Sequence, residues 1–179
     1  RYLGRISLNP IVHLDPIGTM MMLFAAFAGR GIGWGKPVPV NPRNLRYGPR
    51  IGMGIVSFAG PLANLVTAAV IGLPLRLGIN LPGSLGMLLL RIMFINIGLA
   101  VFNLIPLPPL DGYGVLQGIL AGIRGPTSYR ISQSLTAFEQ QGPILLFVLI
   151  LAGQFFGFDL LGRFMDPLVW LFTRLFLGV

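Results

Sequence analysis

The sequence predicts an all-α protein that crosses a membrane several times. Of its 179 residues, 54% are hydrophobic and only 10% are charged, and the mean hydropathy is +0.80. A composition of this kind is typical of polytopic membrane proteins rather than of soluble domains. Two apolar runs, at about residues 51–73 and 85–107, are each long enough to cross the hydrocarbon core as a helix.

Residues 1–50 are expected to form a region of interfacial loop and edge strand. Residues 1–16 mix polar and apolar side chains with two prolines, which predicts an ordered loop at the interface. Residues 17–29 are apolar but fall short of the ~20 residues that a spanning helix needs. They form either a re-entrant or extended segment or part of a tilted span. Residues 35–41, GKPVPVN, favour an edge strand, to which proline is confined within sheets; the alternative is a stiff linker on lipid headgroups.

Residues 51–161 are expected to form the transmembrane core. It should hold three spans, at about residues 51–73, 85–107 and 143–161. The first span carries small residues that would let a neighbouring helix approach closely: Gly52, Gly54, Ala59, Gly60 and Ala63. Residues 109–142 are polar enough to form an extramembrane segment with a surface helix. In this segment, Glu139 is expected at a solvated position. Residues 162–179 suit an amphipathic interfacial helix or a short membrane tail.

The charge distribution predicts the orientation in the membrane. The net charge is +8, and the basic residues lie beside apolar segments, which favours contact with lipid over nucleic acid. Five basic residues lie within residues 30–50, whereas the turn at residues 74–84 holds only Arg76. By the positive-inside rule, residues 1–50 and 109–142 are cytoplasmic. The chain has no cysteine, which excludes disulfides and thiolate metal sites.

The second span ends in a turn that carries an acid. Residues 102–112 are FNLIPLPPLDG, and Pro106, Pro108 and Pro109 prevent the backbone from staying helical there. An unwound segment at membrane depth persists only where it lines a cavity or is buried in protein, and a carboxylate there is a candidate functional group. Asp111 is therefore the first candidate site residue. The alternative is an ordinary Asp-Gly turn in which Asp111 accepts hydrogen bonds from nearby backbone amides.

Several motifs resemble those of the site-2 protease family, the intramembrane zinc metallopeptidases. FNLIPLPPLDG resembles the family's aspartate motif, NPIVHLDPIG at residues 9–18 matches a motif of its bacterial branch, and AGPLAN at residues 59–64 and GKPVPVN match others. For AGPLAN, the alternative is a close-packed helix start without chemistry. The motifs follow the family's order over nearly the whole chain. The resemblance implies a site-2 protease-like transmembrane core in the bacterial cytoplasmic membrane.

The resemblance also implies roles for two residues. Asp111 would be the third zinc ligand, and Asn103 would lie near the reacting carbonyl, where an amide can donate to a developing oxyanion. An interhelical hydrogen bond is the alternative for Asn103. The family's other two ligands are histidines of an HExxH helix, whereas this sequence has one histidine, His13, and no HExxH. His13 is interpreted as a structural hydrogen bonder, so zinc belongs to the intact site and is not expected to be held by this chain alone.

These observations leave three functional hypotheses. In the first, the intact protein is a zinc-dependent intramembrane endopeptidase that cleaves transmembrane substrates, and an HExxH helix is expected upstream of Arg1, which is not a methionine. In the second, the chain is a catalytically inactive relative that serves as a structural subunit of a larger membrane complex, because it cannot assemble a zinc site by itself. The third is a carrier with an ion site at residues 103–112, for which the chain lacks an inverted repeat. The expected partners are membrane lipid and either a transmembrane substrate or complex subunits.

Overall fold

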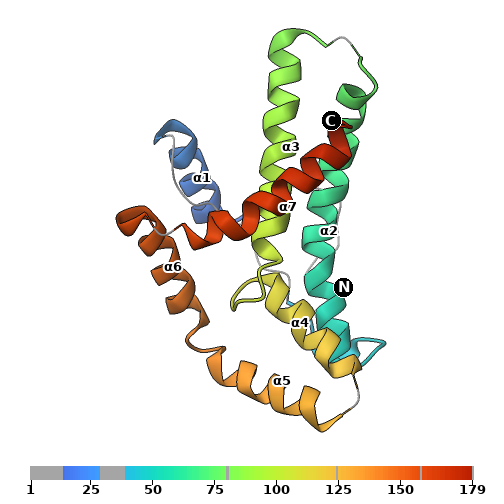
Figure 1. The fold of residues 1–179 in the computed structure, drawn as a ribbon, viewed down its shortest axis with the longest axis vertical. Helices are drawn as coiled ribbons and strands as arrows, with labels where there is room; N and C mark the ends of the chain where they lie inside the picture. Colours follow the sequence, from blue (N-terminus) through green and yellow to red (C-terminus); the bar gives the residue numbers. More distant parts are fainter. Residues whose placement is uncertain (1–13, 29–38, 80, 124, 158, 179) are drawn as a thin grey trace. The chain divides into compact units, whose positions relative to one another are not determined.

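The computed structural model describes residues 14–28, 39–79, 81–123, 125–157 and 159–178. Its helices are α1 (Pro16–Ala28), η2 (Pro42–Asn44), α2 (Pro49–Arg76), α3 (Gly83–Asn103), α4 (Asp111–Gly122), α5 (Pro126–Phe138), α6 (Gly142–Phe156) and α7 (Leu160–Leu177) (Figure 1). The predicted all-α fold is confirmed, since the described residues form helices and turns and no sheet. The chain divides into two compact units, Arg1–Asn41 and Pro42–Val179.

The first unit contributes one described helix, α1. Asp15 caps it, because the Asp15 Oδ1 atom accepts hydrogen bonds from the backbone N–H groups of Ile17 at 3.1 Å and Gly18 at 2.9 Å. The sequence left residues 17–29 open between extended and helical forms, and the described part of this segment is helical. His13 and most of GKPVPVN lie outside the described residues, so the edge strand stays a prediction.

The second unit is built around two apolar helices, α2 and α3, that pack against each other. With 28 and 21 residues, both are long and apolar enough to cross a membrane. Helix α2 begins at Pro49, where the missing N–H of proline costs nothing. Helix α3 ends at Asn103, ahead of the end predicted for the second span, and the proline-rich turn of residues 104–110 follows it.

The segment predicted as the third span, residues 143–161, is divided between two helices. Helix α6 ends at Phe156, and Gly157 follows it in the left-handed conformation with φ of 67°. At 15 residues, α6 falls below the usual length of a spanning helix. It meets the criteria for a span only together with α5, from which it is bent by 71°. The described residues therefore hold two spanning helices, or three if this bent pair crosses as one.

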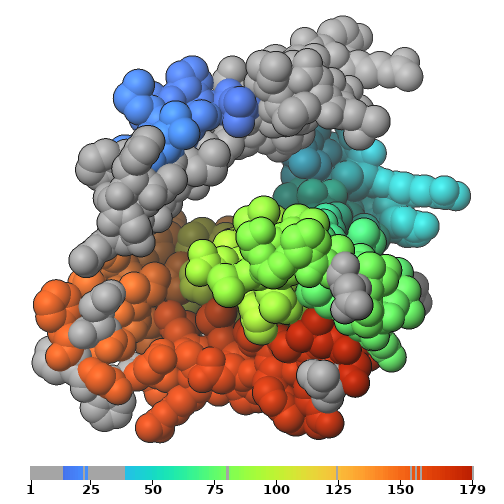
Figure 2. All heavy atoms as spheres, turned by 90° about the horizontal axis from the view of Figure 1, so that it is seen from above, coloured from blue at the N-terminus to red at the C-terminus, as the bar shows by residue number. Residues whose placement is uncertain are grey.

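Helix α7 lies across α3 and α2 and completes the apolar core of this unit (Figures 1 and 2). Ala68, Met93, Ile97 and Val101 are fully buried, and Val169, Phe172 and Phe176 are among the α7 residues that pack against them. The Arg76 Nη1 atom donates a hydrogen bond of 2.7 Å to the carbonyl oxygen of Leu175, so the two helix ends are joined. This core lies at the C-terminal half of α2, and the N-terminal half is left to pack against α4.

Candidate functional site

Asp111 is the first residue of α4, directly after the proline-rich turn. Leu110 precedes it in an extended conformation and caps the helix. A carboxylate in the first turn is favoured by the positive end of the helix dipole. The prolines that the sequence identified therefore end one helix, and the acid that follows them begins the next.

The proline-rich turn packs so closely against the start of α4 that there is no room for a side chain at residue 112. A Cβ atom on Gly112 would collide with the backbone carbonyl groups of Leu104 and Ile105. Both obstacles are backbone atoms, which cannot move aside as a flexible side chain could. The glycine of the Leu-Asp-Gly motif is therefore explained by packing, and it fixes where Asp111 begins α4.

Close contacts between small residues bring α4 against α2. A Cβ atom on Gly54 would lie 2.8 Å from the Cα of Gly118, and the reverse distance is also 2.8 Å. One turn further along both helices, Gly114 lies directly against the Ser57 side chain. The prediction that small residues of the first span admit a close neighbour is met by Gly54, whereas Gly52 faces Leu45.

The same contact brings Asp111 to the AGPLAN segment. A Cβ atom on Gly60 would lie 3.3 Å from the Asp111 Oδ2 atom. Gly60 and Ser57 are one turn apart on α2, and Asp111 and Gly114 are one turn apart on α4. Two motifs that are about 50 residues apart in the sequence therefore meet at the carboxylate, and AGPLAN gains a packing role beside the acid.

The Asp111 carboxyl group is partly buried, and it lies outside the two spanning helices. Desolvation by this burial raises the pKa of Asp111 above the ordinary value for aspartate. A carboxylate whose charged form is disfavoured in this way gains from a cation placed beside it. Partial burial therefore distinguishes Asp111 from a fully solvated turn residue, and its role as a metal ligand stays a prediction.

Asn103 ends α3 and donates a hydrogen bond from Nδ2 to the Leu99 carbonyl oxygen at 2.9 Å. This bond lies within α3, so it is not the interhelical bond considered as an alternative. An amide has two N–H donors and a carbonyl acceptor, so Asn103 keeps capacity for a further partner. Its proposed position near a reacting carbonyl stays a prediction.

The described residues do not make a complete zinc site. Among them, no group of three histidine, cysteine, aspartate or glutamate side chains could hold a metal ion. A catalytic zinc takes three protein ligands and keeps one open position. Asp111 can supply one carboxylate, and His13, which the sequence analysis interpreted as a structural hydrogen bonder, lies outside the described residues. The donor set of the described part is therefore too small for zinc by itself.

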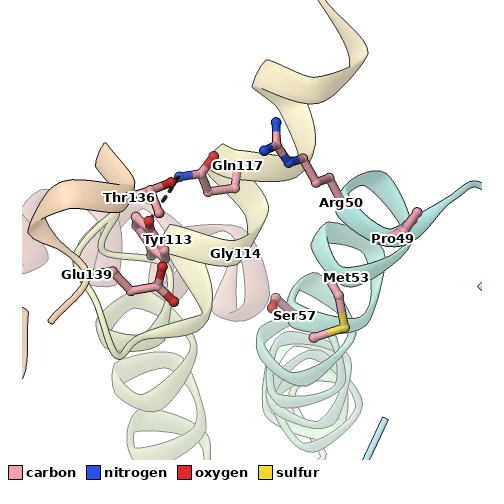
Figure 3. Close-up of a pocket in the computed structure, with 9 residues that line it drawn as sticks. All are labelled: Pro49, Arg50, Met53, Ser57, Tyr113, Gly114, Gln117, Thr136 and Glu139. Carbon is pink, nitrogen blue, oxygen red and sulfur yellow. Dashed lines mark hydrogen bonds between the residues drawn. The ribbon is translucent and has the colours of Figure 1, made fainter. Parts of the chain in front are cut away.

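A cavity of about 400 Å³ opens beside the α2–α4 contact, one turn from Asp111 (Figure 3). Its walls come from the start of α2, the first half of α4 and the end of α5; they are lined by Pro49, Arg50, Met53, Ser57, Tyr113, Gly114, Gln117, Thr136 and Glu139. Arg50 and Glu139 lie on opposite sides of it (Figure 3). The sequence analysis placed Glu139 at a solvated position, and the residue is exposed on the cavity wall.

A hydrogen-bonded group of side chains joins α4 to α5 at this cavity. The Gln117 Nε2 atom donates to the Tyr113 hydroxyl at 2.9 Å, and the Ser132 hydroxyl donates to Gln117 Oε1 at 2.6 Å. Tyr113 is 9% exposed and Ser132 is 5% exposed. The sequence analysis missed Tyr113 and Gln117, although their spacing of four residues predicts that they share one helix face.

The opposite side of the α2–α4 contact is an apolar groove of about 350 Å³. Its lining has no charged or amide side chain: Ile51, Gly54, Ile55, Phe58, Val115, Gly118 and Ile119. The contact between the two helices therefore separates a polar cavity from an apolar groove.

Comparisons with known proteins identify related sequences. Residues 79–149 match the family model of Peptidase family M50. The chain is 34% identical over 184 residues to "Putative zinc metalloprotease YwhC" of Bacillus subtilis, an alignment that covers 97% of this chain and 78% of that protein. No solved structure matches the chain.

Two mycobacterial proteins, both named "Putative zinc metalloprotease Rip2", are also similar. The chain is 29% identical over 150 residues to the Mycolicibacterium smegmatis protein, covering 83% of this chain and 54% of that one. It is 32% identical over 171 residues to the Mycobacterium tuberculosis protein, covering 89% of this chain and 62% of that one. The chain thus spans less than two thirds of the length of these two relatives.

Proposed function

Because the chain belongs to peptidase family M50, the site-2 protease family, and is a multi-pass membrane protein, we propose that it forms part of a zinc-dependent intramembrane endopeptidase that cleaves transmembrane protein substrates. The observation that carries this proposal is the setting of Asp111. Its carboxylate begins α4 after the proline-rich turn, packs beside Gly60 of α2, and is partly desolvated. A single carboxylate held in this way suits a metal ligand.

In this proposal, two residues of the chain have separate tasks. Asp111 holds the metal ion as one of three protein ligands, and the other two come from an HExxH segment. Zinc in such a site acts as a Lewis acid and activates water. Asn103, at the end of α3, uses its free amide hydrogen to orient the carbonyl group of the peptide bond to be cleaved.

The test is Asp111→Asn in the full-length protein. The amide is nearly isosteric but is a neutral and poorer zinc ligand, so cleavage of a co-expressed transmembrane reporter substrate and zinc content should both be lost while the melting temperature changes little. Asp166→Asn on α7 is the matched control and should cleave normally. Wild-type cleavage with unchanged zinc in the Asp111 variant would reject the ligand role.

A catalytically inactive family member, acting as a structural subunit of a larger membrane complex, is the second candidate. It is suggested by the incomplete donor set of the described residues. In this case neither the full-length wild type nor any variant would cleave the reporter. The Asp111→Asn variant would then differ from wild type only in stability or in assembly with its partners.

We also propose that residues 1–50 and residues 109–142 both face the cytoplasm, as the basic residues before α2 predict. The proposal is tested by labelling single cysteines introduced by Lys36→Cys and Ser134→Cys in intact cells. Both should be protected from a membrane-impermeant reagent and become reactive only after permeabilisation. Labelling of the two sites from opposite sides would contradict this arrangement.

A further inference from the structure

The polar cavity between α2, α4 and α5 lies at the N-terminal end of a helix that is longer than the hydrocarbon core of a bilayer. Helix α2 has 28 residues, which at 1.5 Å per residue is about 42 Å. The hydrocarbon core of a bilayer is only about 30 Å thick, so α2 is about 12 Å longer than the core, and the charge of Arg50 favours a place for the first residues of α2 in the headgroup layer. Pro49, Arg50 and Met53, in the first two turns of α2, form one wall of the cavity.

The cavity carries opposite charges on opposite walls. Arg50 adds a positive charge to the start of α2, and Glu139 adds a negative charge at the C-terminal end of α5 (Figure 3). The helix dipoles have the same signs at these two ends, so they reinforce the charges. Among the described residues, neither Arg50 nor Glu139 takes part in an ion pair within the chain, and both are exposed to the cavity.

A buried hydroxyl group adds a hydrogen-bond donor to the cavity, on the side where Thr136 and Glu139 lie (Figure 3). The Tyr113 side chain is 9% exposed, and its oxygen already accepts a hydrogen bond from Gln117. A phenol also has one hydrogen to donate, and no acceptor for it is found in the described part of the chain. Tyr113 lines the cavity, so this hydrogen can reach a ligand there.

We propose that this cavity binds the headgroup of a phospholipid that carries both a phosphate and a primary ammonium group. The phosphate lies at Arg50 and accepts from the Tyr113 hydroxyl, and the ammonium lies at Glu139. A volume of about 400 Å³ is within the range of small-molecule sites. The charge pattern excludes a purely anionic headgroup as the best ligand, since such a group would leave Glu139 without a cation.

A lipid fits this cavity better than a soluble zwitterion because an apolar surface continues from it. Val56, Ala59 and Ala63 of α2 are exposed and form one apolar strip along the helix, which begins one turn after Met53 of the cavity wall. Acyl chains can lie along these residues while the headgroup occupies the cavity. The site is independent of the proposed peptidase activity.

The experiment measures saturable binding of short-chain lipids to the purified full-length protein in detergent, by native mass spectrometry. Phosphatidylethanolamine should bind about fivefold more tightly than phosphatidylglycerol, which lacks the cation, and phosphatidylcholine, whose ammonium has no N–H. Glu139→Gln should abolish this preference, because the ammonium group loses its partner. Arg50→Gln and Tyr113→Phe should each weaken the binding of all three lipids, which share the phosphate, and leave their ranking unchanged.

Arg130→Gln is the matched control, because Arg130 is an exposed cation of α5 that does not line the cavity. It should bind like wild type, and all variants should melt like wild type without lipid. Equal binding of the three lipids would overturn the proposal. The proposal would also be overturned if phosphatidylglycerol bound as tightly as phosphatidylethanolamine and Glu139→Gln had no effect. Binding of free phosphoethanolamine as tightly as the lipid would overturn it too. So would displacement of the lipid by a soluble Asp-Lys peptide at a lower concentration than the lipid itself.

Discussion

The two halves of α2 make different kinds of contact. The N-terminal half meets α4 through Gly54 and Ser57, so that backbone lies against backbone. In the C-terminal half, Ala68 of α2 lies in the apolar core that α2 forms with α3 and α7. The fully buried side chain of Met93 on α3 belongs to the same core. One half therefore brings polar groups of neighbouring helices to fixed positions, while the other half fills space with apolar side chains. The candidate site lies at the first half, and the core lies at the second.

This difference matters because lipid is as apolar as a protein core. In a membrane, burial of apolar side chains between helices gains little from the hydrophobic effect, and association depends on close packing and on hydrogen bonds. The contact between the N-terminal half of α2 and α4, the α4 end, should therefore be weakened by substitutions that add atoms. The core that the C-terminal half of α2 forms with α3 and α7 should be weakened by substitutions that remove atoms. Variants at the two ends test this expectation.

The largest effect is expected for Gly112→Ala at the α4 end. The added methyl group would collide with the carbonyl groups of Leu104 and Ile105, which should lower the free energy of unfolding by about 3 kcal/mol and displace Asp111. Thermal unfolding in detergent measures the loss. Gly122→Ala, in the same helix but with nothing within 4 Å of the new Cβ atom, should be neutral or slightly stabilising. Equal melting temperatures for the two variants would contradict this packing.

Gly54→Ala should follow with a somewhat smaller loss. Its Cβ atom would lie 2.8 Å from the Gly118 Cα and 3.2 Å from the Gly114 carbonyl oxygen, so α4 must move away from α2 at a cost of about 2.5 kcal/mol. Thermal unfolding in detergent measures the loss, and Gly98→Ala in α3, with nothing within 4 Å of the new Cβ atom, is the control. A melting temperature equal to that of Gly98→Ala would show that the contact between α2 and α4 tolerates a methyl group.

Met93→Ala tests the other end by removing atoms. Met93 is fully buried, and we expect a loss of about 2 kcal/mol, the low end for buried methionine, because lipid provides an apolar reference state. The contact between α2 and α4 should be unchanged, so the losses of Met93→Ala and Gly54→Ala should add in the double variant, as measured by thermal unfolding in detergent. A loss in the double variant that differs from the sum by more than about 0.5 kcal/mol would show that the two halves of α2 are not independent.

The smallest effect is expected for Arg76→Gln. This change removes the hydrogen bond from Arg76 Nη1 to the Leu175 carbonyl oxygen, which should cost about 1 kcal/mol. Proteolysis of the C-terminal end of α7 should become faster, while the Asp111 end is unaffected. Arg91→Gln, an exposed arginine of α3, serves as the control and should leave the proteolysis rate unchanged.

The all-helical membrane class and the break before α4 follow from local sequence patterns. Apolar composition favours helices in lipid, because every backbone polar group must be satisfied internally. Three prolines within four residues, at positions 106, 108 and 109, interrupt a helix, whereas the single prolines Pro61 and Pro74 are accommodated inside α2. Both arguments depend only on neighbouring residues. For the same reason Asp111 could be selected as a candidate site residue without knowledge of any tertiary contact.

The surroundings of Asp111, in contrast, depend on tertiary contacts. Whether Gly60 or another small residue faces the carboxylate depends on how α2 and α4 cross. The division of the predicted third span at Gly157, and the cavity shared by Arg50, Tyr113 and Glu139, likewise depend on how separate helices are placed. These contacts join residues that are far apart in the chain, and periodicity can predict which face a residue occupies but not which partner packs against that face.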